Sequence, residues 1–169
     1  SATIGLALLC SPSYSARAWT TPATFAVRGG ASSSVPSSTS LGATAIEVDT
    51  KPIEGMRPGT SGLRKKVEVW QAVDEANKNY VENFIQSLVD TAMDNNEGKP
   101  LDTLIVAGDG RYFNNEAIQI IAKVLAGNGV KNIWIPQGGI MSTPAVSAAI
   151  RTREGGKAQG GIVLTASHN

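Results

Sequence analysis

Short apolar runs alternate with longer amphipathic stretches from about residue 47 onward, and this alternation limits the folds open to the chain. Residues 103–107 and 161–164 are rich in Val, Ile and Leu, as expected for strands that are covered on both faces. Residues 132–135 form a third strand-like run, and residues 66–70 alternate polar and apolar side chains like a half-buried strand. The pattern predicts a layered α/β/α domain with a mixed sheet of about four strands.

Three stretches between these runs have the periodicity of helices. Residues 76–93 carry an aromatic or apolar side chain at every fourth position, and residues 118–125 repeat the pattern before a glycine-rich end. Ser142 or Thr143 can cap a third helix, with Pro144 in its first turn. Helices therefore separate the predicted strands, as a layered fold requires.

The last five residues, Thr-Ala-Ser-His-Asn at 165–169, follow directly on the final apolar run. Because α/β folds place their ligands beyond the carboxyl ends of strands, Ser167 is a candidate nucleophile. His168 beside it is the only histidine in the chain. The same five residues also fit a simple turn in which Ser167 or Asn169 caps a following helix, and by themselves they do not decide between the two.

Residues 55–67 form a glycine-rich loop with a strong local positive charge. Between positions 56 and 67 there are four Lys or Arg residues and no Asp or Glu. Glycines allow close backbone approach, hydroxyls add donors, and basic side chains neutralise an anion. The residues suited to hold a phosphate are Thr60, Ser61, Gly62, Arg64 and Lys65. The order of residues is not that of a Walker loop, and a solvated basic turn is the alternative interpretation.

Together, P-G-T-S-G-L-R-K-K-V at 58–67 and G-I-V-L-T-A-S-H-N at 161–169 resemble the first domain of the phosphoglucomutases, in the α-D-phosphohexomutase superfamily. Residues 107–114, 116–121 and 139–147 resemble the same domain, and all these stretches follow the order of the family. The resemblance runs from about residue 53 to residue 169.

The resemblance implies an enzyme that interconverts glucose 1-phosphate and glucose 6-phosphate. Ser167 would be a phosphoserine that donates its phosphoryl group to a hexose phosphate, with glucose 1,6-bisphosphate as intermediate. Arg64 and Lys65 would offset the phosphate charge, and Thr60, Ser61 and Gly62 would contact the substrate or the phosphoserine. Mg²⁺ is the implied metal, with one ligand from the phosphate on Ser167. His168 would support the phosphoserine or transfer a proton, or it is only a packed neighbour.

Part of the family pattern is absent from the sequence. The signature continues with a proline after Asn169, and the metal loop and sugar-binding loops lie in later domains. We therefore expect a first domain that is truncated at its carboxyl terminus, has no mutase activity alone and is a monomer at full length. The alternatives are a mutase for mannose or glucosamine phosphates, or a non-catalytic phosphate-binding domain.

Residues 1–46 differ in composition from the rest of the chain. They contain no Asp, Glu or Lys and are rich in Ser, Thr, Ala and Pro, which predicts disorder. An apolar run at 4–10 precedes an A-x-A pattern at 16–18, and the remainder resembles a transit peptide. This pattern predicts a targeting leader for a plastid, followed by the domain at 47–169. An ordinary extension on a cytoplasmic protein is the alternative.

Composition excludes several classes of protein. With 41% hydrophobic and 17% charged residues the chain is globular, and its net charge of +1 indicates neither a nucleic-acid nor a membrane partner. A single cysteine, Cys10, excludes an internal disulfide framework.

Two further groups of residues are more simply structural than functional. Asp109 and Arg111 could be a catalytic acid and a phosphate clamp, but a local ion pair in a strand-to-helix turn is the expected role. The aromatic side chains have core spacing rather than that of a sugar-stacking platform.

Overall fold

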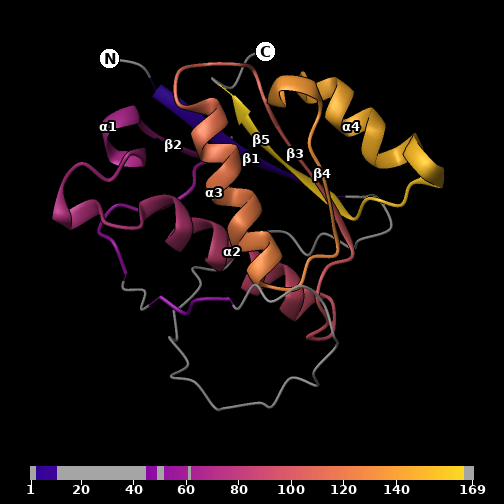
Figure 1. The fold of residues 1–169 in the computed structure, drawn as a ribbon, viewed down its shortest axis with the longest axis horizontal. Coiled ribbons are helices and arrows are strands. Elements are labelled where there is room, and N and C mark those ends of the chain that lie inside the picture. Colours follow the sequence, from indigo (N-terminus) through magenta and orange to yellow (C-terminus); the bar gives the residue numbers. More distant parts are fainter. Residues whose placement is uncertain (1–2, 11–44, 49–51, 61, 166–169) are drawn as a thin grey trace.

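The structure, a computed structural model, describes residues 3–10, 45–48, 52–60 and 62–165. Its sheet has five strands in the order β2-β1-β5-β3-β4 (Figure 1). The strands are β1 (Thr3–Cys10), β2 (Leu63–Lys66), β3 (Thr103–Gly108), β4 (Asn132–Trp134) and β5 (Gly160–Thr165). Because β3 is parallel to β4 and β5 while β1 is antiparallel to both of its neighbours, the sheet is mixed, as predicted.

Helices cover both faces of this sheet. They are α1 (Val67–Trp70), α2 (Tyr80–Asn95), α3 (Asn114–Gly127) and α4 (Thr143–Thr152). Single 3-10 turns occupy Glu75–Asn77, Gln137–Gly139 and Arg153–Gly155. Helices α2 and α3 pack on one face and α4 on the other (Figure 1), which is the predicted α/β/α layering.

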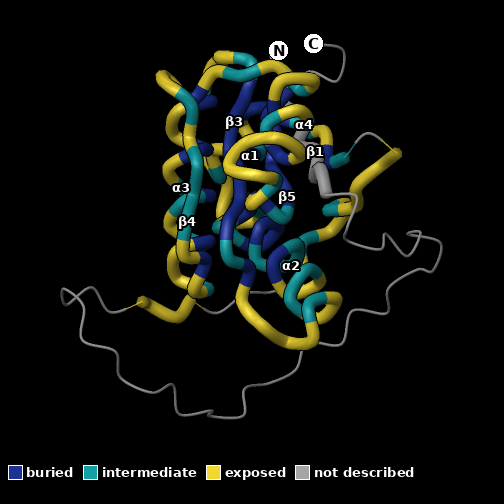
Figure 2. Tube along the Cα trace, turned by 90° about the vertical axis from the view of Figure 1, so that its right-hand side faces the viewer, coloured by how far each residue is buried: buried dark blue, intermediate teal, exposed yellow. Residues whose placement is uncertain are grey.

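Alternation along the central strands explains the two layers. Strands β3 and β5 are buried along their whole length (Figure 2). Leu104 and Val106 belong to the core beneath α2 and α3, whereas Ile105 and Ala107 pack with Val146 of α4. A run of consecutive apolar residues is therefore required, since each face of the strand meets its own helical layer.

Two predictions differ from the structure. Residues 66–70 were expected as a strand, but β2 ends at Lys66 and Val67–Trp70 is a helical turn. Val67 and Trp70 are both buried, and their spacing of three residues places them on one face of the helical turn. A segment of only four residues fits both the strand and the helix period, so the sequence pattern alone did not separate the two. Disorder was predicted for residues 1–46, yet Thr3–Cys10 forms a strand of the sheet; residues 11–44 lie outside the described part.

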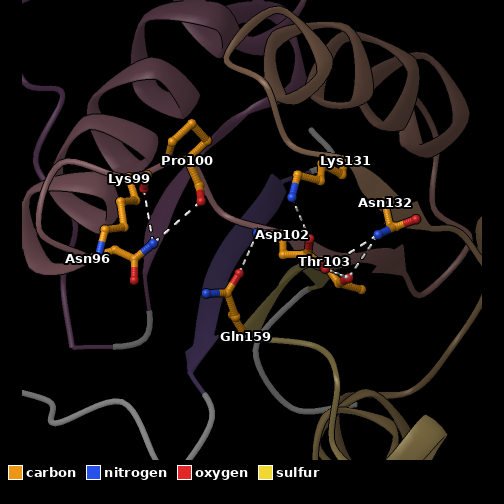
Figure 3. A network of polar contacts seen from close by, with 8 residues as sticks. All are labelled: Asn96, Lys99, Pro100, Asp102, Thr103, Lys131, Asn132 and Gln159. Atoms are coloured by element: carbon orange, nitrogen blue, oxygen red, sulfur yellow. Dashed lines mark hydrogen bonds and ion pairs between the residues drawn. The ribbon is translucent and has the colours of Figure 1, made fainter.

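A polar network joins the strands at their amino-terminal edge (Figure 3). The Thr103 hydroxyl donates to Asp102 Oδ2 at 2.9 Å, and Lys131 Nζ lies 3.3 Å from Asp102 Oδ1. Asn132 Nδ2 donates to Thr103 Oγ1 at 3.2 Å, while Gln159 Oε1 accepts from the Asp102 amide. The hydrogen bond from Thr103, followed by that from Lys131, holds the pKa of Asp102 below its usual value. The starts of β3, β4 and β5 are thereby tied together.

Among the described residues, no helix combines the length and apolar character needed to cross a lipid bilayer.

Candidate active site

The carboxyl ends of β3 and β5 meet at the edge opposite the polar network. The Asp109 amide donates to the Leu164 carbonyl at 3.0 Å, and the Met141 amide donates to the Gly108 carbonyl at 2.9 Å. Thr165, at the end of β5, is buried at this edge. Ser167 and His168 follow it but lie outside the described residues, so their predicted roles stay predictions.

The turn after β3 contains the ion pair expected from the sequence. Arg111 Nε lies 2.6 Å from Asp109 Oδ2. The Asp109 side chain is only 11% exposed, whereas Arg111 is 41% exposed. Asp109 thus lies on the buried side of the turn, whereas the Arg111 side chain is partly in solvent. The prediction of a local ion pair in a strand-to-helix turn is confirmed.

Asn114 is a buried polar residue at this edge that sequence reasoning passed over. It is the first residue of α3 and 3% exposed, and neither its Nδ2 nor its Oδ1 has a hydrogen-bond partner in the described part of the chain. Its amide lies between two glycines: a Cβ at Gly108 would be 1.9 Å from Oδ1, and one at Gly139 would be 3.5 Å from Nδ2. Phe113 before it has a left-handed backbone with φ +67°, which is uncommon for a bulky residue.

The buried amide of Asn114 has chemical consequences. An unmet donor or acceptor in a protein interior costs roughly 1–3 kcal/mol, so such a group is rarely without a reason. Asn114 offers both a donor and an acceptor beside the ends of β3 and β5. The sequence signal was a polar residue at the start of a helix that directly follows a glycine-containing turn, and that signal is weak when taken alone.

The glycine-rich loop before β2 is closed by its own backbone. Gly59 and Gly62 exchange two hydrogen bonds, from Gly59 N to Gly62 O at 3.0 Å and from Gly62 N to Gly59 O at 3.1 Å. Gly62 has φ +86°, a left-handed conformation that favours glycine. Thr60 is exposed within this turn, and Ser61 lies outside the described residues. Thr60 is therefore open to an incoming anion.

The two basic residues proposed for phosphate binding both lie on β2. Arg64 is exposed and Lys65 is half-buried, with its Nζ 3.4 Å from the position a Cβ would take at Gly55. Successive side chains of a strand point to opposite faces, so Arg64 and Lys65 leave β2 in opposite directions. As β2 is the last strand of the sheet, the two side chains can reach one anion only around its outer edge.

Register relates this basic strand to the end of β5. Gly5 of β1 pairs with Arg64 on one side and with Thr165 on the other. Adjacent strands lie about 4.8 Å apart, so the backbones of Arg64 and Thr165 are roughly 10 Å apart, at the same level of the sheet. The fold thus places the basic strand level with the last described residue before Ser167.

The described residues do not form a metal site. Within residues 3–10, 45–48, 52–60 and 62–165 there is no group of three or more His, Cys, Asp or Glu side chains that could hold an ion. The metal ligand expected from the sequence, the phosphate on Ser167, lies outside those residues. Hence the described residues supply no such group of three protein ligands, and the phosphate ligand on Ser167 stays a prediction.

Residues 55–169 match the family described as phosphoglucomutase/phosphomannomutase, alpha/beta/alpha domain I. The chain belongs to this family. The match includes the glycine-rich loop, the turn after β3 and the final strand with its Ser-His-Asn end, and it confirms the fold predicted from the sequence. The domain begins, in this match, close to where the leader-like composition ends.

Several relatives of this domain I chain are phosphoglucomutases. "Phosphoglucomutase, cytoplasmic" from Mesembryanthemum crystallinum is 54% identical over 126 residues, which cover 72% of this chain and 20% of the relative. The protein of the same name from Pisum sativum is 51% identical over 130 residues, which cover 75% of this chain and 21% of the relative. A solved structure is also similar to this chain, with a TM-score of 0.60 and 48% identity. It is the crystal structure of the exocytosis-sensitive phosphoprotein pp63/parafusin, a phosphoglucomutase from Paramecium, in its open form, and the match covers 71% of this chain and 20% of that one. The chain thus spans about one fifth of the length of these relatives.

Proposed function

We propose that this domain is the first domain of a phosphoglucomutase that interconverts glucose 1-phosphate and glucose 6-phosphate. The observation that supports this most is the family match over residues 55–169, because it contains both the basic loop and the Ser167 strand. Identities of about one half to relatives named phosphoglucomutase favour glucose phosphates over mannose or glucosamine phosphates.

In the proposed reaction Ser167 rests as a phosphoserine. A hydroxyl oxygen of the hexose monophosphate bonds to the phosphorus as the bond from the phosphorus to Ser167 Oγ breaks. The hydroxyl proton passes to a base, for which His168 is the candidate, and from there to Ser167 Oγ, which becomes a hydroxyl. The resulting glucose 1,6-bisphosphate turns over and returns its other phosphoryl group to Ser167. Positioning and charge neutralisation dominate such transfers, which is the role proposed for Arg64 and Lys65, with Thr60, Ser61 and Gly62 contacting the phosphate.

Phosphate mapping combined with a coupled assay tests this proposal. The protein is purified from its source, its peptides are mapped for phosphate, and glucose 6-phosphate formation from glucose 1-phosphate is followed. We expect phosphate on Ser167 and loss of nearly all activity in Ser167→Ala. Ser87→Ala is the control, since Ser87 lies on α2 and donates only to the Asn83 carbonyl. An active Ser167→Ala protein would refute the phosphoserine mechanism, and faster turnover of mannose 1-phosphate would favour the phosphomannomutase alternative.

We propose further that the 169-residue chain has no mutase activity by itself. It spans only about one fifth of its relatives, and its described residues form no metal site. The purified chain should bind a hexose phosphate weakly and convert none of it. Measurable turnover by this chain would contradict the proposal, while binding without turnover in the native protein would favour a non-catalytic phosphate-binding domain. The proposed full-length enzyme is a monomer, which light scattering can test.

The leader assignment for residues 1–46 is a proposal as well. Composition supports a plastid leader, whereas the names of the relatives favour the cytoplasmic alternative. Amino-terminal sequencing of the native protein separates the two. A mature terminus near residue 19 or between 19 and 47 indicates a processed leader, and an intact Ser1 or an upstream residue indicates the cytoplasmic alternative.

A further inference from the structure

A pair of amide side chains joins α2 to the carboxyl end of α3. Gln86 Nε2 donates to Asn128 Oδ1, and Asn128 Nδ2 donates to Gln86 Oε1, both at 2.8 Å. Asn128 Nδ2 also donates to the Val124 carbonyl at 2.8 Å. Because α2 and α3 pack against each other (Figure 1), the Gln86–Asn128 pair links two helices through residues that are 42 positions apart in the sequence. The Asn128 carboxamide is thus held by three hydrogen bonds.

Asn128 is followed by Gly129, and this is the only Asn-Gly step in the sequence. Such a step can lose ammonia, because glycine has no Cβ to crowd its nitrogen as it approaches the preceding side chain. The Gly129 nitrogen gives its proton to water and bonds to Asn128 Cγ, while the bond from Cγ to Nδ2 breaks and Nδ2 leaves as ammonia with a proton from water. Water then opens the cyclic imide, which leaves aspartate or isoaspartate at position 128.

The fold opposes the first step of this reaction. The Gly129 amide, which must supply the attacking nitrogen, donates to the Ala126 carbonyl at 3.0 Å. The Asn128 carboxamide cannot turn toward that nitrogen without giving up its hydrogen bonds to Gln86 and Val124. The reactive geometry therefore requires a local opening in which the end of α3 separates from α2.

A carboxylate at position 128 would not restore the pair. It has no N–H, so the oxygens of Gln86 and Val124 would lose their donor and face a negative charge. Gln86 Nε2 also donates to Asp90 Oδ1 at 2.8 Å, so two carboxylates would share this nitrogen. Residue 128 is the C-cap of α3, where the helix dipole disfavours negative charge. All three effects weaken the packing of α3 on α2.

We propose that Asn128 is a deamidation site that Gln86 protects. Deamidation proceeds when the end of α3 separates from α2, and the charge that it leaves prevents the Gln86–Asn128 pair from forming again. The modification thereby records an opening of the two helices and makes the next opening easier. It depends on no ligand and on no step of the proposed sugar phosphate chemistry.

Peptide mapping by mass spectrometry tests the protection. The full chain is incubated at mildly alkaline pH, folded or in urea, and aspartate and isoaspartate at position 128 are followed with time. We expect the folded chain to react at least about tenfold more slowly than the chain in urea. Gln86→Ala should react at least about fivefold faster than the folded wild type, which is the factor for one lost hydrogen bond. Gln119→Ala is the matched control, because Gln119 is an exposed residue of α3.

Equal rates in the folded chain and in urea would overturn the proposal, and so would an unchanged rate in Gln86→Ala. If circular dichroism shows that Gln86→Ala is unfolded, Gln86→Met takes its place. Methionine keeps the length of the side chain and favours a helix but has no amide, so the same acceleration is expected.

The thermal stability of Asn128→Asp tests the effect of the new charge. Near neutral pH the midpoint of unfolding should lie at least about 3 °C below that of the wild type. Asn115→Asp is the control, since it adds the same charge in the first turn of α3, where the helix dipole favours it, and should leave the midpoint unchanged or raise it. An Asn128→Asp protein as stable as the wild type would contradict the proposed effect of deamidation on α2 and α3.

Discussion

Replacing Gly108 by alanine tests the packing at the candidate active site most directly. Gly108 is the last residue of β3, and a Cβ there would lie 1.9 Å from Asn114 Oδ1 and 2.9 Å from the Leu164 carbonyl oxygen. Real Cβ atoms do not come within 3.0 Å of such atoms, so the first contact is too close by about 1 Å. The Leu164 carbonyl accepts from the Asp109 amide, so the backbone cannot move away without loss of that bond. The Asn114 side chain has no hydrogen bond to lose among the described residues but is buried, so its movement is opposed by packing.

The expected loss of stability follows from this overlap. Overpacking of an interior typically costs about 1–3 kcal/mol, and two close contacts place Gly108→Ala near the upper end. For a chain of this size each kcal/mol lowers the midpoint of thermal unfolding by about 2–4 °C, so a fall of roughly 6–12 °C is expected. Urea denaturation followed by circular dichroism gives the free energy of unfolding, and a thermal scan gives the midpoint.

A second substitution separates the Asn114 contact from the others. In Gly108→Ala/Asn114→Ala the shortest contact disappears, so the double variant should be more stable than the sum of the single effects predicts by at least about 1 kcal/mol. Gly127→Ala is the control, because the nearest atom to its Cβ outside its own helix is 4.0 Å away and its φ is not positive, so alanine adds neither a close contact nor backbone strain. Wild-type stability in Gly108→Ala, or strict additivity in the double variant, would refute the reasoning.

Three further predictions concern single side chains. Asp102→Asn should flatten the fall in stability at acid pH, which thermal scans between pH 6 and 3 can measure. Folding lowers the pKa of Asp102, so this carboxylate stabilises the fold above its unfolded pKa of about 4. That stabilisation is lost as the pH falls below this value. Tyr80→Phe should leave stability unchanged or raise it, since the Tyr80 hydroxyl is buried without a partner among the described residues. Burial raises the pKa of this phenol, so the variant should also lack the tyrosine ionisation that occurs at the highest pH in an ultraviolet titration. Arg153→Gln should change the fluorescence of Trp134 and cost about 0.5–1 kcal/mol in urea denaturation, because the guanidinium lies 4.8 Å from the ring centroid, whereas unchanged emission would contradict that contact.

Much of the fold could be predicted from local patterns. Strands at 103–107 and 161–164 and the helices between them were expected close to where they occur, because runs of apolar residues and helical periodicity are strong signals over such lengths. Residues 66–70 were mistaken for a strand, since four residues fit either period and only the burial of Val67 and Trp70 on one face decides for a helix.

The sequence proposed only the charged and nucleophilic members of the candidate site, and their roles stay predictions. Glycines, basic residues and a serine after a strand are visible in a sequence because their chemistry is carried by residue type. Asn114 could not be identified as a site residue in this way, because it stands out only through its burial between Gly108 and Gly139, which are separated from it along the chain. The opposite directions of Arg64 and Lys65 likewise follow only once both are known to lie on one strand.

By itself the sequence determined that the fold is a layered α/β fold, that residues 55–67 form a basic, glycine-rich loop, and that Ser167 follows an apolar run typical of a buried strand. These follow from short-range periodicity and from motifs that need no partner to be recognised. Only the tertiary structure decided which strands are neighbours, that Thr3–Cys10 lies between β2 and β5, and that Gly5 brings Arg64 level with Thr165. The physical reason is that strand pairing is satisfied by backbone groups common to every residue, so the choice of partner depends on how the whole chain buries its surface.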